Sequence, residues 1–237
     1  MPSILALVSD VAKGLRASGT TYQPELGSVV PWRVDTVPDD PAAQVAYTIG
    51  LMNDGALDSA ATPELQRDAE TARTLGNGDV VTGAHTLVRS ALRFREDADT
   101  AGWLQLPGNS DTVEVLTSPV DLSRAVAAGL QPAEDCDGYA MYVASVLLAA
   151  GVPCAYVTVA ADPYQPGDYS HVYVAAYPAG RGRIVLDASH GEWAGWECPD
   201  QWNRKREWPL RRRRSHRLLA LAILAAAAVF ATRGVTQ

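Results

Sequence analysis

Residues 135–153 read DCDGYAMYVASVLLAAGVP. Asp135 can cap a helix, the stretch that follows is apolar on nearly every face, and a Gly-Val-Pro sequence ends it. A helix that is apolar all round has to be buried inside a domain. The stretch therefore predicts a central helix over residues 139–150, with Cys136 close to its first turn.

The segments on either side of this helix indicate the fold class. Cap residues and apolar spacing predict earlier helices over residues 42–52, 65–75, 80–95 and 119–128. Turn residues and β-branched runs predict later strands over residues 154–160, 171–177 and 183–187. Helices followed by strands favour an α+β fold, in which the buried helix packs on a small antiparallel sheet.

The composition is that of a folded protein. Of the 237 residues, 47% are hydrophobic and 20% are charged, which excludes a disordered chain. Three cysteines cannot form a disulfide framework, and they fit a reducing, cytoplasmic compartment. The net charge is −7, and nine of the 20 lysines and arginines lie after residue 203, so the body is strongly acidic. Nucleic acid is not expected to bind the body, because the body repels phosphate.

Four regions are expected along the chain. Residues 1–40 are expected to form an N-terminal arm with little regular structure, and residues 41–192 form the main domain. Residues 193–210 hold four of the six tryptophans and are expected to be a flap or a linker. Residues 211–237 combine a basic segment with an apolar C-terminal helix. The apolar run Ile4–Val8 is too short for a secretory signal, which needs about 7–15 apolar residues.

Cys136 has the setting of a reactive thiol. The N-terminus of a helix carries a partial positive charge, and its free N–H groups stabilise a thiolate or an oxyanion. Glu134, Asp135 and Asp137 oppose this, because carboxylates beside the sulfur disfavour its ionisation. A histidine close to the sulfur compensates for them, and His171 is the candidate.

His171 and Asp187 belong to two strands that a short loop joins. If these strands pair across residues 178–182, any register in which the paired numbers sum to an even value puts His171 and Asp187 on one face. At a sum of 358 they are directly opposite, and at 360 they are diagonal and within reach of a side-chain hydrogen bond. Asp187 then orients His171, and His171 takes the proton of Cys136, as in thiol acyl-transfer enzymes. His190 is the rival base.

The residues that carry this chemistry also resemble a known family. The run DCDGYA at 135–140, the strand HVYV at 171–174 and the strand end LD at 186–187 are similar to the transglutaminase-like superfamily, whose order is Cys, His, Asp. The resemblance covers roughly residues 80–190 and is greatest to bacterial and bacteriophage members. It implies a papain-like fold with Cys136, His171 and Asp187 as the catalytic triad. It also implies that Gln131 lies near the position of an oxyanion-hole side chain.

Two functions follow as hypotheses. The first is a cysteine-dependent acyl-transfer enzyme, either a peptidase or amidase or a transamidase, that acts on a protein or peptide through Cys136, His171 and Asp187. The second is a non-catalytic structural or assembly module, for example a virion or membrane-associated component, that keeps the same fold. No cofactor is expected, and no metal site is expected either, because the cysteines and histidines lack the CxxC or HxxxH spacing of metal ligands.

The C-terminal region is expected to contact a membrane or a partner subunit. From Arg211 to Ala231 the chain has four consecutive arginines and then an apolar run that begins at Leu218. As a helix, Leu218 to Thr232 is roughly 22 Å long, against a hydrocarbon core of about 30 Å. The basic block fits an anchor that holds the body in the cytoplasm, and a phage-encoded chain would instead be associated with the virion.

Overall fold

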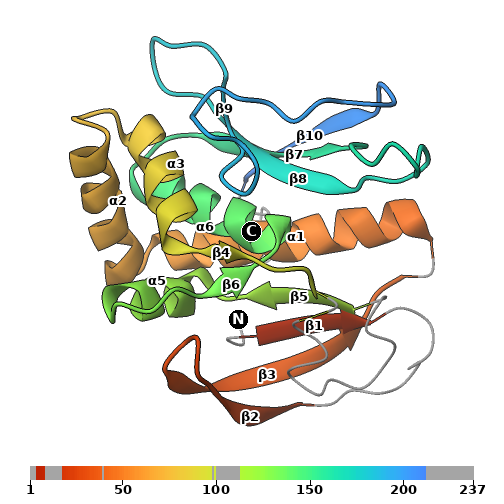
Figure 1. Ribbon diagram of the computed structural model, residues 1–237, viewed down its shortest axis with the longest axis horizontal. Helices are drawn as coiled ribbons and strands as arrows, with labels where there is room; N and C mark the ends of the chain where they lie inside the picture. The colour runs from red at the N-terminus through yellow and green to blue at the C-terminus, as the bar shows by residue number, and fades with distance from the viewer. Residues whose placement is uncertain (1–3, 9–17, 39, 98, 100–112, 212–237) are drawn as a thin grey trace, which may run out of the picture.

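The computed structural model describes residues 4–8, 18–38, 40–97, 99 and 113–211 (Figure 1). The helices are α1 (Pro41–Ala60), α2 (Pro63–Leu75), α3 (Val80–Ala91), α5 (Pro119–Ala127) and α6 (Cys136–Ala149). The strands are β1 (Ile4–Val8), β2 (Ser18–Gln23), β3 (Ser28–Thr36), β4 (Arg93–Phe94), β5 (Val113–Thr117), β6 (Ala133–Glu134), β7 (Cys154–Val159), β8 (His171–Ala176), β9 (Ile184–Leu186) and β10 (Lys205–Pro209). This mixture of helices and small sheets confirms the predicted α+β class.

Two four-stranded sheets enclose the central helices. One sheet has the strand order β2-β3-β1-β5, and the other has the order β10-β7-β8-β9. Figure 1 shows them on opposite sides of the molecule, with α1 and α6 between them and α2, α3 and α5 gathered at one end. A single apolar core reaches from Leu5 and Leu116 in the first sheet, through α6, to Tyr156 and Val174 in the second. The site therefore has a rigid support on both sides.

Helix α6 is buried along most of its length, as its sequence predicts. The side chain of Asp135 caps it by accepting the backbone N–H groups of Asp137 and Gly138. The helix therefore begins at Cys136, which confirms the cap predicted at Asp135. Further along it, the hydroxyl of Tyr142 donates to Asp68 at 2.8 Å and ties α6 to α2.

The N-terminal region differs most from its prediction. Residues 1–40 are not an arm without regular structure, because they contain β1, β2 and β3, and β1 pairs with both β3 and β5. Leu5 and Leu7 belong to the main core, whereas Ile4 and Ala6 belong to a second apolar cluster on the other face. Because both faces of β1 are buried, its sequence lacks the apolar–polar alternation by which a half-buried strand is recognised.

Helix α3 ends four residues before the predicted position, because the chain turns into a strand. The backbone N–H of Arg93 donates to the carbonyl of Pro132 at 2.8 Å, and that of Arg95 donates to the carbonyl of Glu134 at 3.0 Å. These bonds form the short parallel pair of β4 and β6. They hold Phe94 beside the segment that leads into α6.

The tryptophan-rich region is partly a strand of the main domain. Within residues 193–210, expected to be a flap or a linker, β10 pairs antiparallel with β7. The indole N–H of Trp208 donates to Thr158 Oγ1 at 2.9 Å, whereas Trp193 and Trp202 remain exposed. The expected apolar helix from Leu218 to Ala231 lies outside the described residues. Among the described helices, none is both long enough and apolar enough to cross a membrane.

Candidate active site

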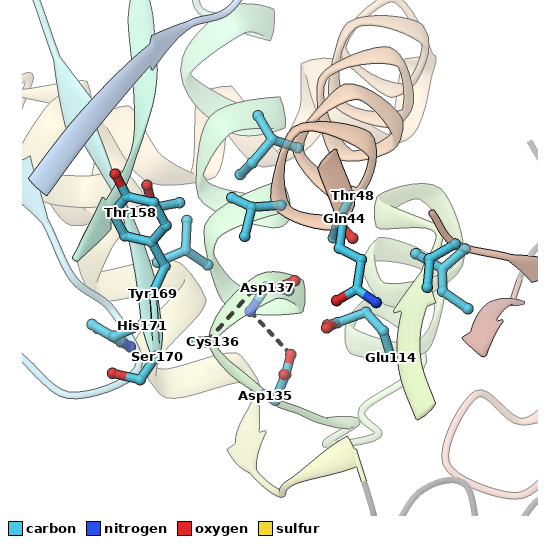
Figure 2. A pocket seen from close by; sticks show the side chains of 15 residues that line it. Gln44, Thr48, Glu114, Asp135, Cys136, Asp137, Thr158, Tyr169, Ser170 and His171 are labelled. Atoms are coloured by element: carbon cyan, nitrogen blue, oxygen red, sulfur yellow. Dashed lines mark hydrogen bonds between the residues drawn. The ribbon is translucent and has the colours of Figure 1, made fainter. Parts of the chain in front are cut away.

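A cavity of about 480 Å³ lies at the N-terminus of α6. Its walls come from α1, from β5 and from the strands β7 and β8, so it lies where both sheets approach the central helix. Cys136 and His171 both line it. Figure 2 shows Gln44 and Glu114 on one side of the cavity, Thr158 and His171 on the other, and Cys136 between them.

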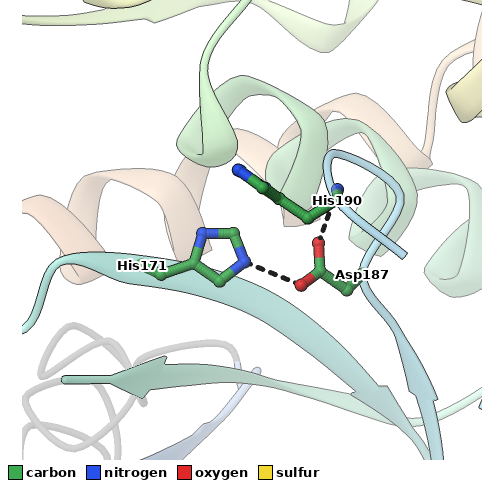
Figure 3. Close-up of side chains that lie close together, drawn as sticks. All are labelled: His171, Asp187 and His190. Carbon is green, nitrogen blue, oxygen red and sulfur yellow. Dashed lines mark hydrogen bonds and ion pairs between the residues drawn. The ribbon is translucent and has the colours of Figure 1, made fainter. Parts of the chain in front are cut away.

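His171 and Asp187 form a direct hydrogen bond. Nε2 of His171 lies 2.7 Å from Oδ2 of Asp187, and both side chains are buried (Figure 3). Strands β8 and β9 pair in the register that places Val174 opposite Leu186, which is the register with a sum of 360. The diagonal arrangement predicted for that register is confirmed.

Asp187 determines the tautomer of His171. Its second oxygen, Oδ1, accepts the hydroxyl of Ser189 at 3.0 Å and the backbone N–H of His190 at 3.1 Å. Burial alone raises the pKa of Asp187, but the hydrogen bond and charge of His171 and the other two donors hold it below its usual range. An ionised carboxylate can only accept hydrogen bonds. His171 therefore carries its proton on Nε2, which leaves Nδ1 unprotonated and able to act as a base.

Cys136 is partly buried at the first position of α6. Oδ1 of Asp135 accepts the backbone N–H groups of Asp137 and Gly138, at 3.0 and 3.4 Å. The N–H of Cys136 is left outside this cap. The sulfur lies against β8, where the backbone N–H of Val172 stabilises the thiolate. The thiol donates to Oδ1 of Asp137 at 3.6 Å, and within the described residues no hydrogen bond joins it to His171.

The electrostatic environment keeps this thiol protonated at rest. Burial raises the pKa of Cys136 well above that of a free thiol, and the carboxyl groups of Asp135 and Asp137 raise it further. The resting site therefore holds a protonated thiol rather than a thiolate. Nucleophilic attack requires a base to remove the thiol proton as the reaction begins.

Carboxyl groups from several elements gather beside the thiol. Asp97, Glu114 and Asp135 bring oxygen atoms within 4.8 Å of one another, and Glu114 also hydrogen-bonds Asp137. Two carboxyl groups share a hydrogen bond only when one of them holds a proton. Burial, followed by mutual repulsion, raises the pKa of all four groups. The cluster therefore retains protons at a pH where exposed carboxyl groups have lost them.

Glu134 carries less charge than its sequence position indicates. Its side chain is buried, and burial raises its pKa to about 8, although Thr117 and Arg95 act in the opposite direction. At neutral pH Glu134 is mostly protonated. The further negative charge expected from this residue beside the thiol is therefore largely absent at that pH.

The structure does not bring Gln131 into the cavity. Gln131 is exposed, and its backbone carbonyl accepts Nε of Arg93 at 3.3 Å. A different glutamine, Gln44 of α1, lines the cavity and extends towards Glu114 and the start of α6 (Figure 2). Sequence reasoning missed Gln44 because nothing near position 44 marks it, and its role depends on the packing of α1 against α6.

Asp97 and Glu114 were missed for the same reason. Both are remote in sequence from Cys136: Glu114 belongs to β5, and Asp97 follows β4 and accepts the backbone N–H of Val115 in β5. Glu114 did leave one signal. It lies two residues before Leu116 in an apolar strand, so both side chains point to the same, interior face. A charged residue at an inward position of a strand is uncommon enough to indicate a site.

Three groups of described side chains have the donor atoms that a metal ion takes. In each group these atoms lie within 4.8 Å of one another, and the groups are His171–Asp187–His190, Asp135–Cys136–Asp137 and Asp97–Glu114–Asp135. Every group also contains hydrogen bonds between its own members or their neighbours, such as the one from His171 to Asp187. These bonds account for the close approach of the side chains without an ion.

The other cysteines stay away from the cavity. Cys154 is buried at the start of β7, and burial raises its pKa to about 12. Cys198 packs on the outer face of the sheet of β7 to β9, and its pKa is raised by burial to about 11. All three cysteines are free thiols. Only Cys136 lines the cavity described here.

Comparison with known proteins adds no functional assignment. No protein-family model matches the chain, and no curated protein matches it either. The geometry and chemistry of the cavity are therefore what indicate a function.

Proposed function

We propose that this protein is a cysteine-dependent acyl-transfer enzyme of transglutaminase-like type that acts on a protein or peptide substrate. The observation that carries the proposal is the 2.7 Å contact of Asp187 with His171, which lines the same cavity as Cys136. The order of these residues along the chain, and the packing of the cysteine-bearing helix on the strand that carries the histidine, support a papain-like arrangement.

The proposed first half-reaction forms a thioester. Nδ1 of His171 takes the thiol proton, and the sulfur of Cys136 bonds to the carbonyl carbon while the π electrons move onto the oxygen. The tetrahedral intermediate then collapses and the carbon–nitrogen bond breaks. His171 returns the proton to the leaving amine, and Asp187 stabilises the imidazolium that exists between the two transfers.

The second half-reaction releases the acyl group. Water or an amine attacks the thioester, and Nδ1 of His171 takes its proton. The carbon–sulfur bond breaks, and the proton passes to the sulfur. Water gives a peptidase or an amidase, and an amine gives a transamidase. In both half-reactions the backbone N–H of Cys136 and the side-chain amide of Gln44 are the proposed donors to the oxyanion.

The proposal is tested by the reactivity of Cys136 towards iodoacetamide. The labelling rate of each cysteine of the full chain is measured at pH 7 by peptide mass spectrometry, with Cys154 and Cys198 as internal references. We expect the labelling of Cys136 to depend on His171, the base that removes the thiol proton as the reaction begins. His171→Ala slows the labelling of Cys136 at least about tenfold and leaves Cys198 unchanged, because it removes only the base.

The alternative function is a non-catalytic structural or assembly module, such as a virion or membrane-associated component. It is favoured by the hydrogen bond that the thiol makes to Asp137 rather than to His171. If His171→Ala has no effect on the labelling of Cys136, this alternative replaces the enzyme.

We further propose that the region from Arg211 to Ala231 holds the body at a membrane or on a partner subunit. The support is its sequence, in which consecutive arginines precede an apolar run. Flotation of the full chain with anionic vesicles tests the membrane contact. Replacing Arg212, Arg213 and Arg214 by glutamine removes the flotation if the contact is electrostatic. Flotation with neutral vesicles alone would contradict an electrostatic contact.

A further inference from the structure

His190 packs against the imidazole of His171. The two rings meet edge to face, with centroids 4.7 Å apart and an angle of 79° between the planes. His190 also meets the ring of Phe94 in the same manner, at 5.1 Å and 72°. Phe94 comes from β4 and is 46% exposed, so the three rings form a continuous wall from the surface to the buried His171.

The same turn connects His190 to Asp187. The backbone N–H of Gly191 donates to the carbonyl of Asp187 at 2.8 Å, which closes the turn that carries both side chains. Oδ1 of Asp187 accepts the backbone N–H of His190 and the hydroxyl of Ser189. Oγ of Ser189 lies 2.9 Å from Nδ1 of His190. One carboxylate therefore serves both imidazoles, directly for His171 and through Ser189 for His190.

This chain of hydrogen bonds determines the proton position on His190. A serine hydroxyl has one hydrogen, and Ser189 gives it to Asp187. The contact between Ser189 and His190 is then a hydrogen bond only if Nδ1 of His190 is the donor. His190 accordingly carries its proton on Nδ1, and its Nε2 is unprotonated. Figure 3 shows the outer nitrogens of both rings on the same side, away from Asp187.

We propose that His190 is a positioning residue for His171: together with Phe94 it holds the imidazole in the orientation that presents Nδ1 to Cys136. This inference rests on the proposed function. Without the second ring, His171 keeps its hydrogen bond through Nε2 and its tilted contact with the Tyr173 ring at 5.9 Å, but it has more freedom to swing about that bond. The packing of the rings limits this motion, and edge-to-face contact between rings is worth about three- to tenfold in an equilibrium.

The charge of His190 is expected to make the reactivity of Cys136 depend on pH. The groups that face it are His171 from β8, Asp187 from its own turn and Arg89 from α3. Burial, and then the neighbouring His171, lowers the pKa of His190, so the ring is neutral at pH 7. When it takes a proton in acid, it places a positive charge beside His171 and disfavours the imidazolium that the reaction needs.

The test compares His190→Ala with His190→Phe in the full chain, with iodoacetamide labelling of Cys136 as the readout. His190→Ala is expected to slow labelling about three- to tenfold at pH 7, and His190→Phe to stay close to the wild type, because phenylalanine retains the ring. His190→Phe also loses the ionisable group. Its labelling rate is therefore expected to fall less steeply below pH 6 than that of the wild type.

A spectroscopic measurement tests the hydrogen-bond chain separately. The ¹⁵N spectrum of the histidine rings is expected to show His190 with its proton on Nδ1 in the wild type. In Ser189→Ala the proton is expected to move to Nε2, because Nδ1 has lost its acceptor. A wild-type spectrum with the proton on Nε2 would overturn this part of the inference.

The outcomes separate this inference from the proposed function. If His171→Ala slows labelling but His190→Ala does not, the positioning role is overturned and the enzyme proposal stands. If His190→Phe is as slow as His190→Ala, ring packing is not what His190 contributes, and the inference also fails. If His171→Ala itself has no effect, the proposed function fails first.

Discussion

Glu134 fills the space beside Gly138 on the first turn of α6. A Cβ atom placed on Gly138 would lie 2.3 Å from Oε2 of Glu134 and 2.7 Å from its Cβ. The buried acid and the glycine are therefore complementary, and each restricts what the other position accepts. Both positions flank Cys136, so their packing also bears on the orientation of the thiol.

Gly138→Ala is expected to lower the thermal stability of the protein. Alanine favours a helix over glycine by about 1 kcal/mol, but overpacking at this site costs about 1–3 kcal/mol. Thermal denaturation measures the net effect. In a Glu134→Gly background the clash is absent, and Gly138→Ala is then expected to stabilise. The same sign of effect in both backgrounds would contradict the complementarity.

Glu134→Gln is expected to flatten the dependence of stability on pH. The pKa of Glu134 rises on folding from 4.5 to about 8, mainly through burial, so the folded protein binds more protons than the unfolded chain within this window. Its contribution is fully present below pH 4.5 and is lost as the pH rises through about 8. Urea midpoints at pH 5 to 9 should therefore fall more steeply for the wild type. Parallel curves for the two proteins would show that Glu134 is not buried.

Asp187→Asn is expected to remove a pH dependence of stability that has the opposite sign to that of Glu134. The pKa of Asp187 lies below its usual 3.8 in the folded protein, so its contribution is present above that pH and is lost as the pH falls through the folded value. The wild type should lose more stability than Asp187→Asn between pH 5 and pH 2. At pH 7 the variant should label more slowly at Cys136, because asparagine does not require the Nε2–H tautomer of His171. Labelling at the wild-type rate would show that Asp187 does not orient the base.

Gln44→Ala is expected to impair acylation without changing the reactivity of the thiol. Removing one oxyanion donor typically costs about 100-fold or more in rate, whereas alkylation by iodoacetamide forms no oxyanion. Acylation is measured as the burst of p-nitrophenol from p-nitrophenyl acetate. Gln131→Ala is the matched control, because Gln131 is exposed and outside the cavity, and it should leave both rates unchanged. Equal effects of the two variants would remove Gln44 from the site.

Features that depend on near neighbours could be predicted from the sequence. Asp135 caps α6, Asp40 caps α1 and Asp79 caps α3, because a cap needs only the next few N–H groups. The relation between His171 and Asp187 followed from the length of one loop and the parity of a strand pair. In both cases the interacting residues are at most about 16 positions apart in the sequence.

Features that depend on remote contacts could not be predicted in the same way. The acidic cluster combines Asp97, Glu114 and Asp135 from three separate segments, and only Asp135 lies next to Cys136 in the sequence. Gln44 joins the site only because α1 packs against α6. Gln131 was expected near the oxyanion-hole position from the family resemblance, but the segment between it and Cys136 pairs with β4, and Gln131 is exposed.

Strand β1 has a consequence for how the chain folds. Its antiparallel partner, β5, follows it in the sequence by roughly 100 residues, which a ribosome adds in roughly 5–20 s. During that time an apolar segment that ends up buried on both faces lacks one of its neighbours. The nascent protein therefore passes through a stage in which Ile4–Val8 can associate with other chains, and co-expressed chaperones should raise the yield of native protein.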